Sequence, residues 1–342
     1  MNINNFITEI VEKRDRVWFG PAGGYWSNLD KEESKKFLKD LPVLGARKTV
    51  EYYFPQYFNV IFSPKRAGGL PLLDPQPGEV IVDVGCMWGA LTVYLAKAGC
   101  AVIAIDQTLE SLRLLQQRLV DESLTNVEVV CSDLKKISYR EASVDTFVVN
   151  GVLEWIPETG TIELKKCYGK KIAKTDDCRS RPDDLQKDFL RNLYLGLKKG
   201  GKLYLAIENR FDFKMFFGCP DPHVNLPFVS LLPRRIADVI SRMRLGRPYI
   251  NWLYSFGGIK ALLSESGFSR IDLYMCFPDY RYPERIIPYS GSLRGFEPTI
   301  KLVNEKGQRP FKRLLARLGE FIIFNKLRLK ILAPSIIAIA QK

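Results

Sequence analysis

The chain has 342 residues, of which 46% are hydrophobic and 12% are aromatic. A chain of this length and apolar content can bury one large core or two smaller ones, which excludes a disordered or fibrous protein. Basic residues outnumber acidic residues by 51 to 38, so the formal net charge is +13. This excess attracts anions but does not indicate which anion the protein binds. Nucleic acid, an acidic glycan, a lipid-linked phosphate and a membrane surface are all possible partners, and the charges could also form a solvated surface with no dedicated partner.

The cysteine and histidine content argues against a metal centre. The seven cysteines form no C-x-x-C pair, and the chain has a single histidine, so no zinc-ligand spacing exists and we expect no metal site. The first residues lack a basic segment followed by an apolar one, and the apolar stretch 331–340 is too short to span a bilayer. We therefore expect a cytoplasmic protein without a transmembrane segment.

Residues 1–70 are expected to form an N-terminal helical and aromatic extension. The pattern predicts helices near 3–14 and 31–38, separated by a turn rich in glycine and aromatic residues at 19–26. The segment 52–58 is strongly aromatic, which suits either an acceptor-binding lid or packing between the extension and the main sheet. Of the two, we favour packing.

The most informative stretch is the apolar run 80–84, which is followed by a glycine loop, a helix pattern and a second apolar run that ends at Asp106. A strand that enters a glycine loop and then a helix presents free backbone N–H groups and the positive end of the helix dipole to a polar ligand. Asp106 lies 23 positions after Asp83. That spacing returns a carboxylate to the end of the next parallel strand, where it can bind ribose hydroxyls, so we infer a cofactor that contains adenosine.

The loop itself discriminates between cofactors. A dinucleotide fingerprint starting at Gly85 needs glycine at position 87, which is methionine. The same residues resemble the acid-x-G-x-G-x-G motif of class I S-adenosylmethionine-dependent methyltransferases at Asp83, Gly85 and Gly89, with only the middle glycine missing. Three later segments, 126–134, 144–156 and 195–207, resemble the third-strand, fourth-strand and fifth-strand motifs of that family and follow in its order.

The resemblance implies an α/β, doubly wound, Rossmann-like sheet of seven strands with an antiparallel last strand. The domain would span 71–342, with insertions at about 158–182, 209–252 and 279–330. We expect a helix in the third insertion, whose apolar members include Leu314, Leu315 and Leu318, to cover the sheet, with a membrane-surface helix as the alternative. The expected strands lie near 80–84, 101–105, 127–131, 145–150, 202–207, 270–277 and 335–342, and the expected helices near 89–98, 108–120, 184–197 and 257–266.

The resemblance also implies that S-adenosylmethionine is the cofactor and that its contacts gather at the ends of the first four core strands. The expected cofactor-binding residues are Asp83, Gly85, Cys86, Gly89, Asp106, Gln107, Ser132, Asp133, Asn150 and Gly151. We expect Glu154, together with Asn150, to shape the cofactor pocket. Met87 would have to point its side chain away from the ligand or enlarge the site.

Two further motifs resemble a bacterial group of these methyltransferases that is associated with glycosyltransferases and surface-polysaccharide assembly. The segment 206–210 reads Ala-Ile-Glu-Asn-Arg and precedes an Asp-Pro-His stretch, and the segment 277–283 reads Phe-Pro-Asp-Tyr-Arg-Tyr-Pro. The resemblance implies methylation of a hydroxyl on a glycan or glycolipid precursor, and such a hydroxyl needs a base to remove its proton. We expect His223 to be that base, with Glu208 and Asp221 as alternatives.

Other functions remain open at this point. The acceptor could be RNA or a small metabolite, and the incomplete first loop also suits a scaffold protein that keeps the cofactor fold without catalysis. Oligomeric state, acceptor identity and association with a membrane do not follow from the sequence.

Overall fold

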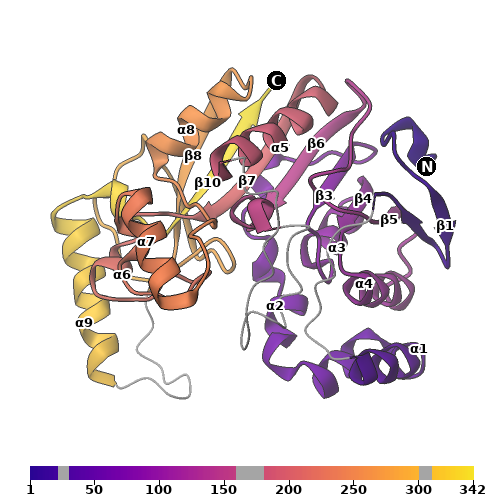
Figure 1. The fold of residues 1–342 in the computed structure, drawn as a ribbon, viewed down its shortest axis with the longest axis horizontal. Helices are drawn as coiled ribbons and strands as arrows, with labels where there is room; N and C mark the ends of the chain where they lie inside the picture. The colour runs from indigo at the N-terminus through magenta and orange to yellow at the C-terminus, as the bar shows by residue number, and fades with distance from the viewer. Residues whose placement is uncertain (22–30, 159–180, 300–309) are drawn as a thin grey trace.

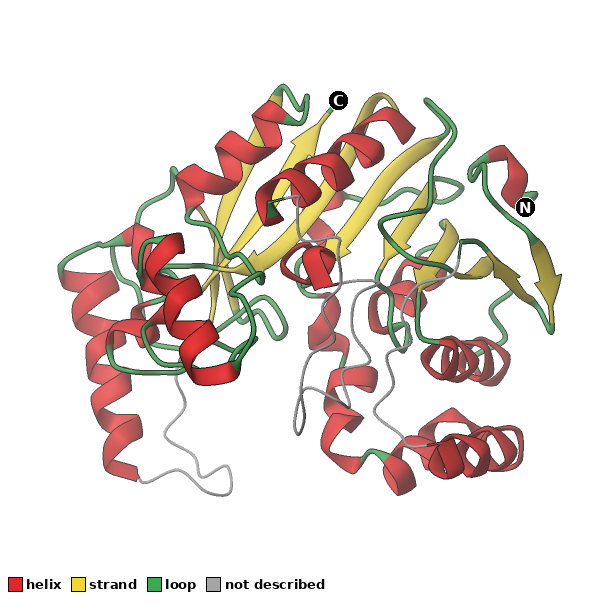
Figure 2. Cartoon of the chain, viewed as in Figure 1, coloured by secondary structure: helices red, strands yellow, loops and turns green. Residues whose placement is uncertain are grey.

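A computed structural model describes residues 1–21, 31–158, 181–299 and 310–342. Ten strands among these residues form one mixed sheet with helices on both faces (Figures 1 and 2). Their order across the sheet is β1-β2-β5-β4-β3-β6-β7-β10-β8-β9. The strands are β1 (Glu12–Arg14), β2 (Val17–Phe19), β3 (Val80–Val84), β4 (Ala101–Asp106), β5 (Val127–Cys131), β6 (Val144–Asn150), β7 (Leu197–Glu208), β8 (Arg270–Phe277), β9 (Arg285–Pro288) and β10 (Ser335–Gln341).

The central seven strands are those expected from the sequence. Strands β5, β4, β3, β6 and β7 are parallel, and β10 lies antiparallel between β7 and β8. The expectation of a seven-stranded sheet was nevertheless incomplete, because a hairpin of β1 and β2 extends one edge and β9 extends the other. The parallel strands place their carboxyl ends along one edge of the sheet, which is where the site residues lie.

Helices cover both faces because successive strand residues point in opposite directions. On β3, Val82 and Val84 join the core cluster that includes residues of α5 and α8, whereas Ile81 joins the cluster that includes residues of α3. The described helices are α1 (Lys31–Tyr53), α2 (Phe58–Phe62), α3 (Ala90–Lys97), α4 (Leu109–Asp121), α5 (Pro182–Gly196), α6 (Phe213–Phe216), α7 (Arg234–Leu245), α8 (Phe256–Glu265) and α9 (Pro310–Glu320).

The N-terminal segment differs from the expectation. The helix predicted over 3–14 is wrong: a short 3-10 turn at Ile3–Asn5 is followed by β1. The reason is tertiary, because β1 pairs antiparallel with β2, and β2 pairs in parallel with β5, which satisfies the backbone hydrogen bonds of this hairpin. The second predicted helix exists as α1 but continues to Tyr53, with a kink at Gly45, whose φ is +76°. Most of the predicted turn at 19–26 lies outside the described residues.

The insertions fall between the core strands. The first, predicted at about 158–182, lies almost entirely outside the described residues. The second carries α6 and α7, and the third carries β9 and α9. The expectation that α9 covers the sheet was wrong, because Leu314, Leu315 and Leu318 are each about half exposed. Phe324, in the π-helical turn that follows α9 (Phe321–Lys326), makes the buried contact instead and packs against Phe277.

Candidate active site

The loop after β3 is held in a shape that only a compact residue fits at its first position. The backbone N–H groups of Gly85 and Cys86 both donate to the carbonyl of Ile105, at 2.8 and 3.0 Å. Gly85 has a φ of +73°, and a Cβ atom there would lie 2.5 Å from a methyl group of Val152. Gly89, at φ +72°, is the N-cap residue of α3. Gly85 therefore lets the β3 loop pack against Val152 in the loop after β6, and Gly89 lets it pack against Leu115 of α4.

Met87 takes the backbone conformation of the glycine it replaces. Its φ is +46°, in the left-handed region, and its backbone N–H donates to Asp106 Oδ2 at 2.9 Å. The side chain packs with Trp88 on the aromatic cluster built by α1 and its neighbours. Within that cluster, the Trp88 ring lies 6.0 Å from Phe54 and 5.1 Å from Tyr57. Aromatic residues of the 52–58 segment thus pack beneath the loop, as favoured.

Two buried carboxylates flank this loop. Asp106 accepts from the N–H groups of Met87 and Thr108, each at 2.9 Å, and burial raises its pKa. Asp83 is 2% exposed and accepts from the Thr92 hydroxyl at 2.6 Å. Burial raises the pKa of Asp83 to about 6, although the Thr92 hydrogen bond opposes the change. Both side chains are therefore fixed by contacts to the β3 loop or to α3.

The remaining predicted cofactor residues lie at the ends of the neighbouring strands. Ser132 and Asp133 follow β5, and the Ser132 hydroxyl and the Asp133 N–H both donate to the carbonyl of Pro21. Gln107 follows β4, and Asn150 and Gly151 stand at the end of β6. Cys86 is buried, which raises the pKa of its thiol. The structure thus brings all ten predicted residues to one edge of the sheet, on β3, β4, β5 and β6 or next to them.

This edge carries buried acceptor atoms of the kind that an adenosine group needs. Two buried acceptor atoms, Gln107 Oε1 and Asn150 Oδ1, have no hydrogen-bond partner among the described residues. A third, Asp133 Oδ2, also lacks a hydrogen bond there and lies 3.7 Å from Lys136 Nζ. They come from the ends of β5, β4 and β6, with β3 between β4 and β6, and such buried atoms are costly unless a ligand or water satisfies them. Adenosine carries an amino group and two ribose hydroxyls, all donors, so the residues present fit the nucleoside part of S-adenosylmethionine.

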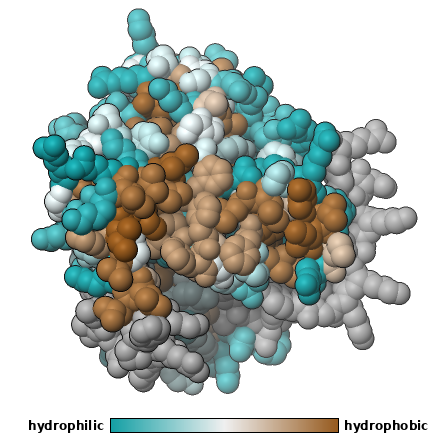
Figure 3. Space-filling model, turned by 90° about the vertical axis from the view of Figure 1, so that its left-hand side faces the viewer, coloured by the Kyte–Doolittle hydropathy of each residue, from teal (hydrophilic) through white to brown (hydrophobic). Residues whose placement is uncertain are grey.

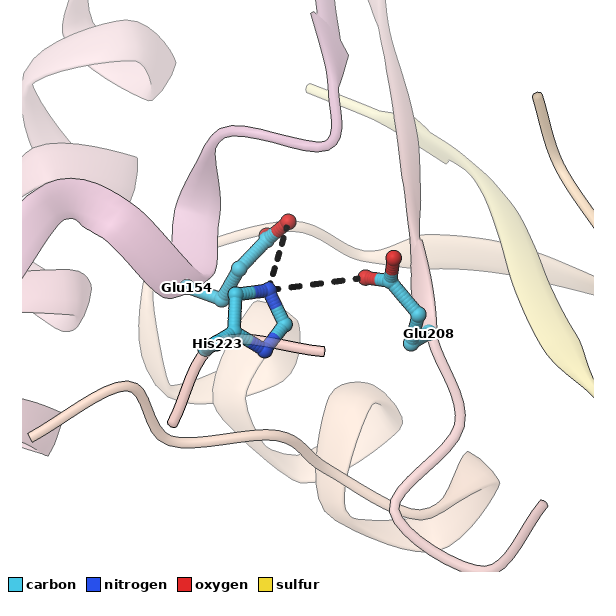
Figure 4. Close-up of side chains that lie close together, drawn as sticks. All are labelled: Glu154, Glu208 and His223. Carbon is cyan, nitrogen blue, oxygen red and sulfur yellow. Dashed lines mark ion pairs between the residues drawn. The ribbon is translucent and has the colours of Figure 1, made fainter. Parts of the chain in front are cut away.

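A second group of polar side chains lies beside this edge (Figure 4). His223 Nε2 is 3.7 Å from Glu154 Oε1 and 3.9 Å from Glu208 Oε2, and its Nδ1 is 3.3 Å from Asp221 Oδ1. Glu154 belongs to the 3-10 turn after β6 (Leu153–Glu158), and Glu208 ends β7. All four side chains are at least nine-tenths buried. We call them the carboxylate–histidine cluster.

The electrostatics of the cluster favour a protonated histidine. Burial alone lowers the pKa of His223, but the carboxylates of Asp221, Glu154 and Glu208 raise it to about 10. Burial raises the pKa of Glu154. The pKa of Asp221 is lowered overall, because contact with His223 outweighs burial. Asp221 is also fixed by the hydroxyl of Tyr249 at 3.0 Å and by the backbone N–H of His223 at 2.9 Å.

Two contributors to the cluster were missed as functional residues. The Tyr280 hydroxyl donates to Glu208 Oε1 at 3.2 Å, and Arg281 approaches the same oxygen at 3.4 Å. Tyr280 also touches the cofactor side, since a Cβ atom on Gly151 would lie 2.3 Å from its hydroxyl oxygen. Both residues belong to the 277–283 motif, but the motif alone did not indicate what either of them does. Glu154, which we expected only to shape the cofactor pocket, is a full member of the cluster.

The cluster also has the composition of a cation site. One ligand atom each from Glu154, Glu208 and His223 lies within 4.8 Å of the others. Carboxylate and imidazole ligands together suit Mn²⁺, Fe²⁺ or Zn²⁺. The zinc-finger spacing rules applied to the sequence do not detect such a group, because its members are far apart along the chain.

Comparisons with known proteins agree with the chemistry of the strand edge. The family described as "Methyltransferase domain" matches residues 82–168. Carboxy-S-adenosyl-L-methionine synthases from Shewanella sp. (strain W3-18-1) and Shewanella baltica (strain OS155 / ATCC BAA-1091) are 28% and 27% identical over 141 residues, 40% of this chain and 47% of each relative. The chain therefore spans about half the length of the curated relatives it matches.

Solved methyltransferase structures are similar to the chain over most of its length. Haemonchus contortus phosphoethanolamine N-methyltransferase 2 has a TM-score of 0.47 at 13% identity, over 93% of this chain and 61% of that one. An S-adenosylmethionine-dependent methyltransferase from Mesorhizobium loti has a TM-score of 0.44 at 13% identity, over 83% of this chain and 100% of that one. The family match places a methyltransferase domain at residues 82–168, and the cofactor of the enzyme is S-adenosylmethionine.

Proposed function

We propose that the protein transfers a methyl group from S-adenosylmethionine to a hydroxyl group of a glycan or glycolipid precursor. The observation that carries this proposal is the carboxylate–histidine cluster, which stands beside the predicted cofactor edge and is linked to it through Tyr280 and Gly151. A methyltransferase that acts on a more acidic or already nucleophilic atom has less need of such a group. The resemblance of the 206–210 and 277–283 motifs to the polysaccharide-associated group supports the same acceptor class.

The chemistry of the acceptor explains why the cluster is needed. S-adenosylmethionine, when bound, supplies a methyl group on a sulfonium centre that is its own leaving group. A sugar hydroxyl keeps its proton at neutral pH, so the protein must accept that proton as the oxygen becomes a nucleophile. A positioned general base contributes ~10²–10⁴-fold to such a step. The residues that orient the hydroxyl contribute through proximity as well.

We assign the base to Glu208 and give His223 a supporting role. The raised pKa of His223 leaves its ring protonated at neutral pH, so it has no free lone pair to accept another proton. Glu208 Oε2 has no hydrogen-bond partner among the described residues, while Oε1 is held by Tyr280 and Arg281. The imidazolium lies 3.7 Å from Glu154 and 3.9 Å from Glu208, so its charge attracts both side chains and holds them in place. Asp221 fixes the ring from its other nitrogen.

Three alternatives lead to different products. Methylation of RNA suits the net charge of +13, and methylation of a small metabolite suits the buried cluster equally well. The name of the Shewanella relatives indicates chemistry on S-adenosylmethionine itself. A scaffold that binds the cofactor without catalysis would give no product at all.

Labelling separates these readings. The protein is incubated with S-adenosylmethionine bearing a deuterated methyl group, together with glycolipid, RNA and metabolite fractions of a cell extract, and mass spectrometry locates the label. We expect it in a glycan or glycolipid hydroxyl. Label only in RNA or a metabolite, or a modified cofactor without transfer, refutes the proposed acceptor. RNA binding would in addition weaken linearly with salt on a double-logarithmic plot.

Two variants test the assigned residues. Glu208→Gln should lower kcat by about 10²-fold or more while the affinity for S-adenosylhomocysteine, measured by calorimetry, stays unchanged. Asp106→Ala should instead weaken that affinity by about 1–3 kcal/mol through loss of a charged acceptor. Asp188→Ala, at a carboxylate whose side chain is 71% exposed on α5, is the matched control and should alter neither. Equal effects of the first two variants would contradict the separation of the two groups.

A further inference from the structure

One side of the molecule carries a broad apolar surface that the core does not use. Figure 3, which faces the side that bears α9 in Figure 1, shows a continuous band of hydrophobic side chains. The segments concerned touch one another, since an added Cβ on Gly319 of α9 would lie 4.0 Å from the ring of Phe217. The exposed apolar residues of these segments are Phe216, Phe217, Phe228, Ile236, Val239, Met243, Leu245, Leu314, Leu315, Leu318, Ile322, Leu327, Leu329 and Ile331.

Helix α9 and the turn after it expose their apolar side chains, whereas a helix that covers a sheet buries them. Leu314, Leu315, Leu318 and Ile322 follow the spacing of one helical face, and each is 42–52% exposed. Glu320, by contrast, is 1% exposed and accepts from the hydroxyl of Thr299. The helix therefore holds its acidic residue inside and its leucines outside. Soluble monomers seldom leave so large an apolar area uncovered unless it binds something.

The charges around this surface have one sign. Arg235, Arg244, Lys326 and Arg328 are exposed and have no ion-pair partner among the described residues. Over α7 and residues 314–332, only Asp238 is a carboxylate that is partly exposed, and it pairs with Arg242. Two copies joined through this surface would bring positive charges together, which is unfavourable. The complementary occupant is an apolar layer with negative groups at its boundary.

We propose that this surface, formed by α6, α7, α9 and residues 321–332, binds the face of a membrane that contains anionic lipid. Among the described residues, no helix combines the length and the apolar character that crossing a bilayer requires. The leucines and phenylalanines would insert at the level of the acyl chains, while the arginines and lysines meet the phosphates. The inference concerns the surface alone and holds whether or not the methyl acceptor is a glycolipid.

The surface lies close to the proposed active site along the chain. The insertion that begins at Asn209 carries α6, α7 and two members of the cluster, Asp221 and His223, so part of the cluster and part of the membrane face belong to one segment. Glu208 precedes α6 by five residues. Binding at this face would bring the site to the bilayer surface, where an anchored acceptor is concentrated.

Vesicle flotation with the full chain tests the proposal. Vesicles of phosphatidylcholine with about a third phosphatidylglycerol should carry the protein, and pure phosphatidylcholine vesicles should carry much less. The double variant Leu314→Ser/Leu318→Ser should raise the lipid concentration needed for half-binding by about tenfold or more, because binding follows the buried apolar area. The control Val120→Ser/Leu195→Ser, at residues 58% and 49% exposed on α4 and α5, should bind like the unmodified protein.

A pair of charge-reversal substitutions tests whether the basic side chains contact anionic lipid. Arg244→Glu/Lys326→Glu should weaken binding to the anionic vesicles, whereas Lys39→Glu/Lys199→Glu, which changes the net charge equally at exposed sites elsewhere, should have little effect. Circular dichroism checks that each variant is folded. Absence of binding at low salt, or equal loss in variants and controls, overturns the proposal. So does a dimer that only the leucine variant dissociates, with no vesicle binding, since the face would then join two copies.

Discussion

Replacing Asp83 by asparagine should change how the stability of the protein depends on pH. Asp83 is 2% exposed, and burial raises its pKa from 3.8 to about 6. Since the folded-state pKa is the higher one, the protonated carboxyl is favoured by folding, and that stability is lost as the pH rises through about 6. Asparagine stays neutral and keeps an oxygen that accepts from the Thr92 hydroxyl. The variant therefore does not lose stability as the pH rises through about 6.

The size of the effect follows from the two pKa values. A rise from 3.8 to about 6 costs the ionised protein about 3 kcal/mol at pH 8 and about half of that at pH 5. The free-energy difference between variant and unmodified protein should therefore shift by about 1.4 kcal/mol between these two pH values, in favour of the variant at pH 8. Any cost of burying the new amide is the same at both.

Urea unfolding at pH 5 and pH 8 measures this shift through the transition midpoints. Asp188→Asn, at an exposed carboxylate, is the control and should show little change between the two pH values. If the stability difference between Asp83→Asn and the unmodified protein is the same at both pH values, the reasoning is refuted, because ionisation of Asp83 would then not destabilise the folded protein. If the variant is more stable but binds S-adenosylhomocysteine more weakly, Asp83 is retained for function at the expense of stability.

Three further outcomes are expected. Gly151→Ala should destabilise the fold by about 1–3 kcal/mol in urea and weaken S-adenosylhomocysteine binding in calorimetry, because φ is +70° and the new Cβ would displace Tyr280; an unchanged affinity would contradict the contact between the two groups. The stability that His223 contributes should be complete below about pH 6.5 and lost as the pH rises through about 10, so the gap in urea midpoint between His223→Gln and the unmodified protein should narrow from pH 6 to pH 10. Extensive dialysis against a chelator should leave methyl transfer intact if the cluster accepts a proton, whereas loss of activity that Mn²⁺ restores would make Glu154, Glu208 and His223 metal ligands.

Much of the core could be predicted because it depends on local pattern. The run Val80–Val84, the loop and the helix that follows form a unit whose hydrophobic period and glycines fix strand, turn and helix together. The helix predicted over 3–14 was wrong because β1 pairs with β2, and β2 in turn pairs with β5, more than 100 residues away in sequence. The prediction for α9 failed for a different reason. An amphipathic pattern predicts a helix with an apolar face, but it does not predict whether that face packs against the sheet.

The site also contains residues that the sequence could place and residues that it could not. The strand-end residues were predictable because parallel strands must end at one edge. His223 and Glu208 could be placed near each other because the insertion starts where β7 ends. Glu154 and Tyr280 could not, because their contacts depend on the path of a 3-10 turn and of the third insertion. The pKa of His223 depends on three carboxylates, so its ordinary value does not describe the ring in this site, and the choice between His223 and Glu208 as base stays a prediction.

The loop after β3 bears on how such motifs are recognised. Gly85, Met87 and Gly89 alternate along the loop, and all three have φ between +46° and +73°. In this chain the loop is therefore characterised by alternating left-handed residues, a conformation that glycine adopts with the least strain. A methionine that can bury its side chain against Trp88 and its aromatic neighbours supplies the same conformation. A search for dihedral angles would find this loop, whereas a search for three glycines would pass it by.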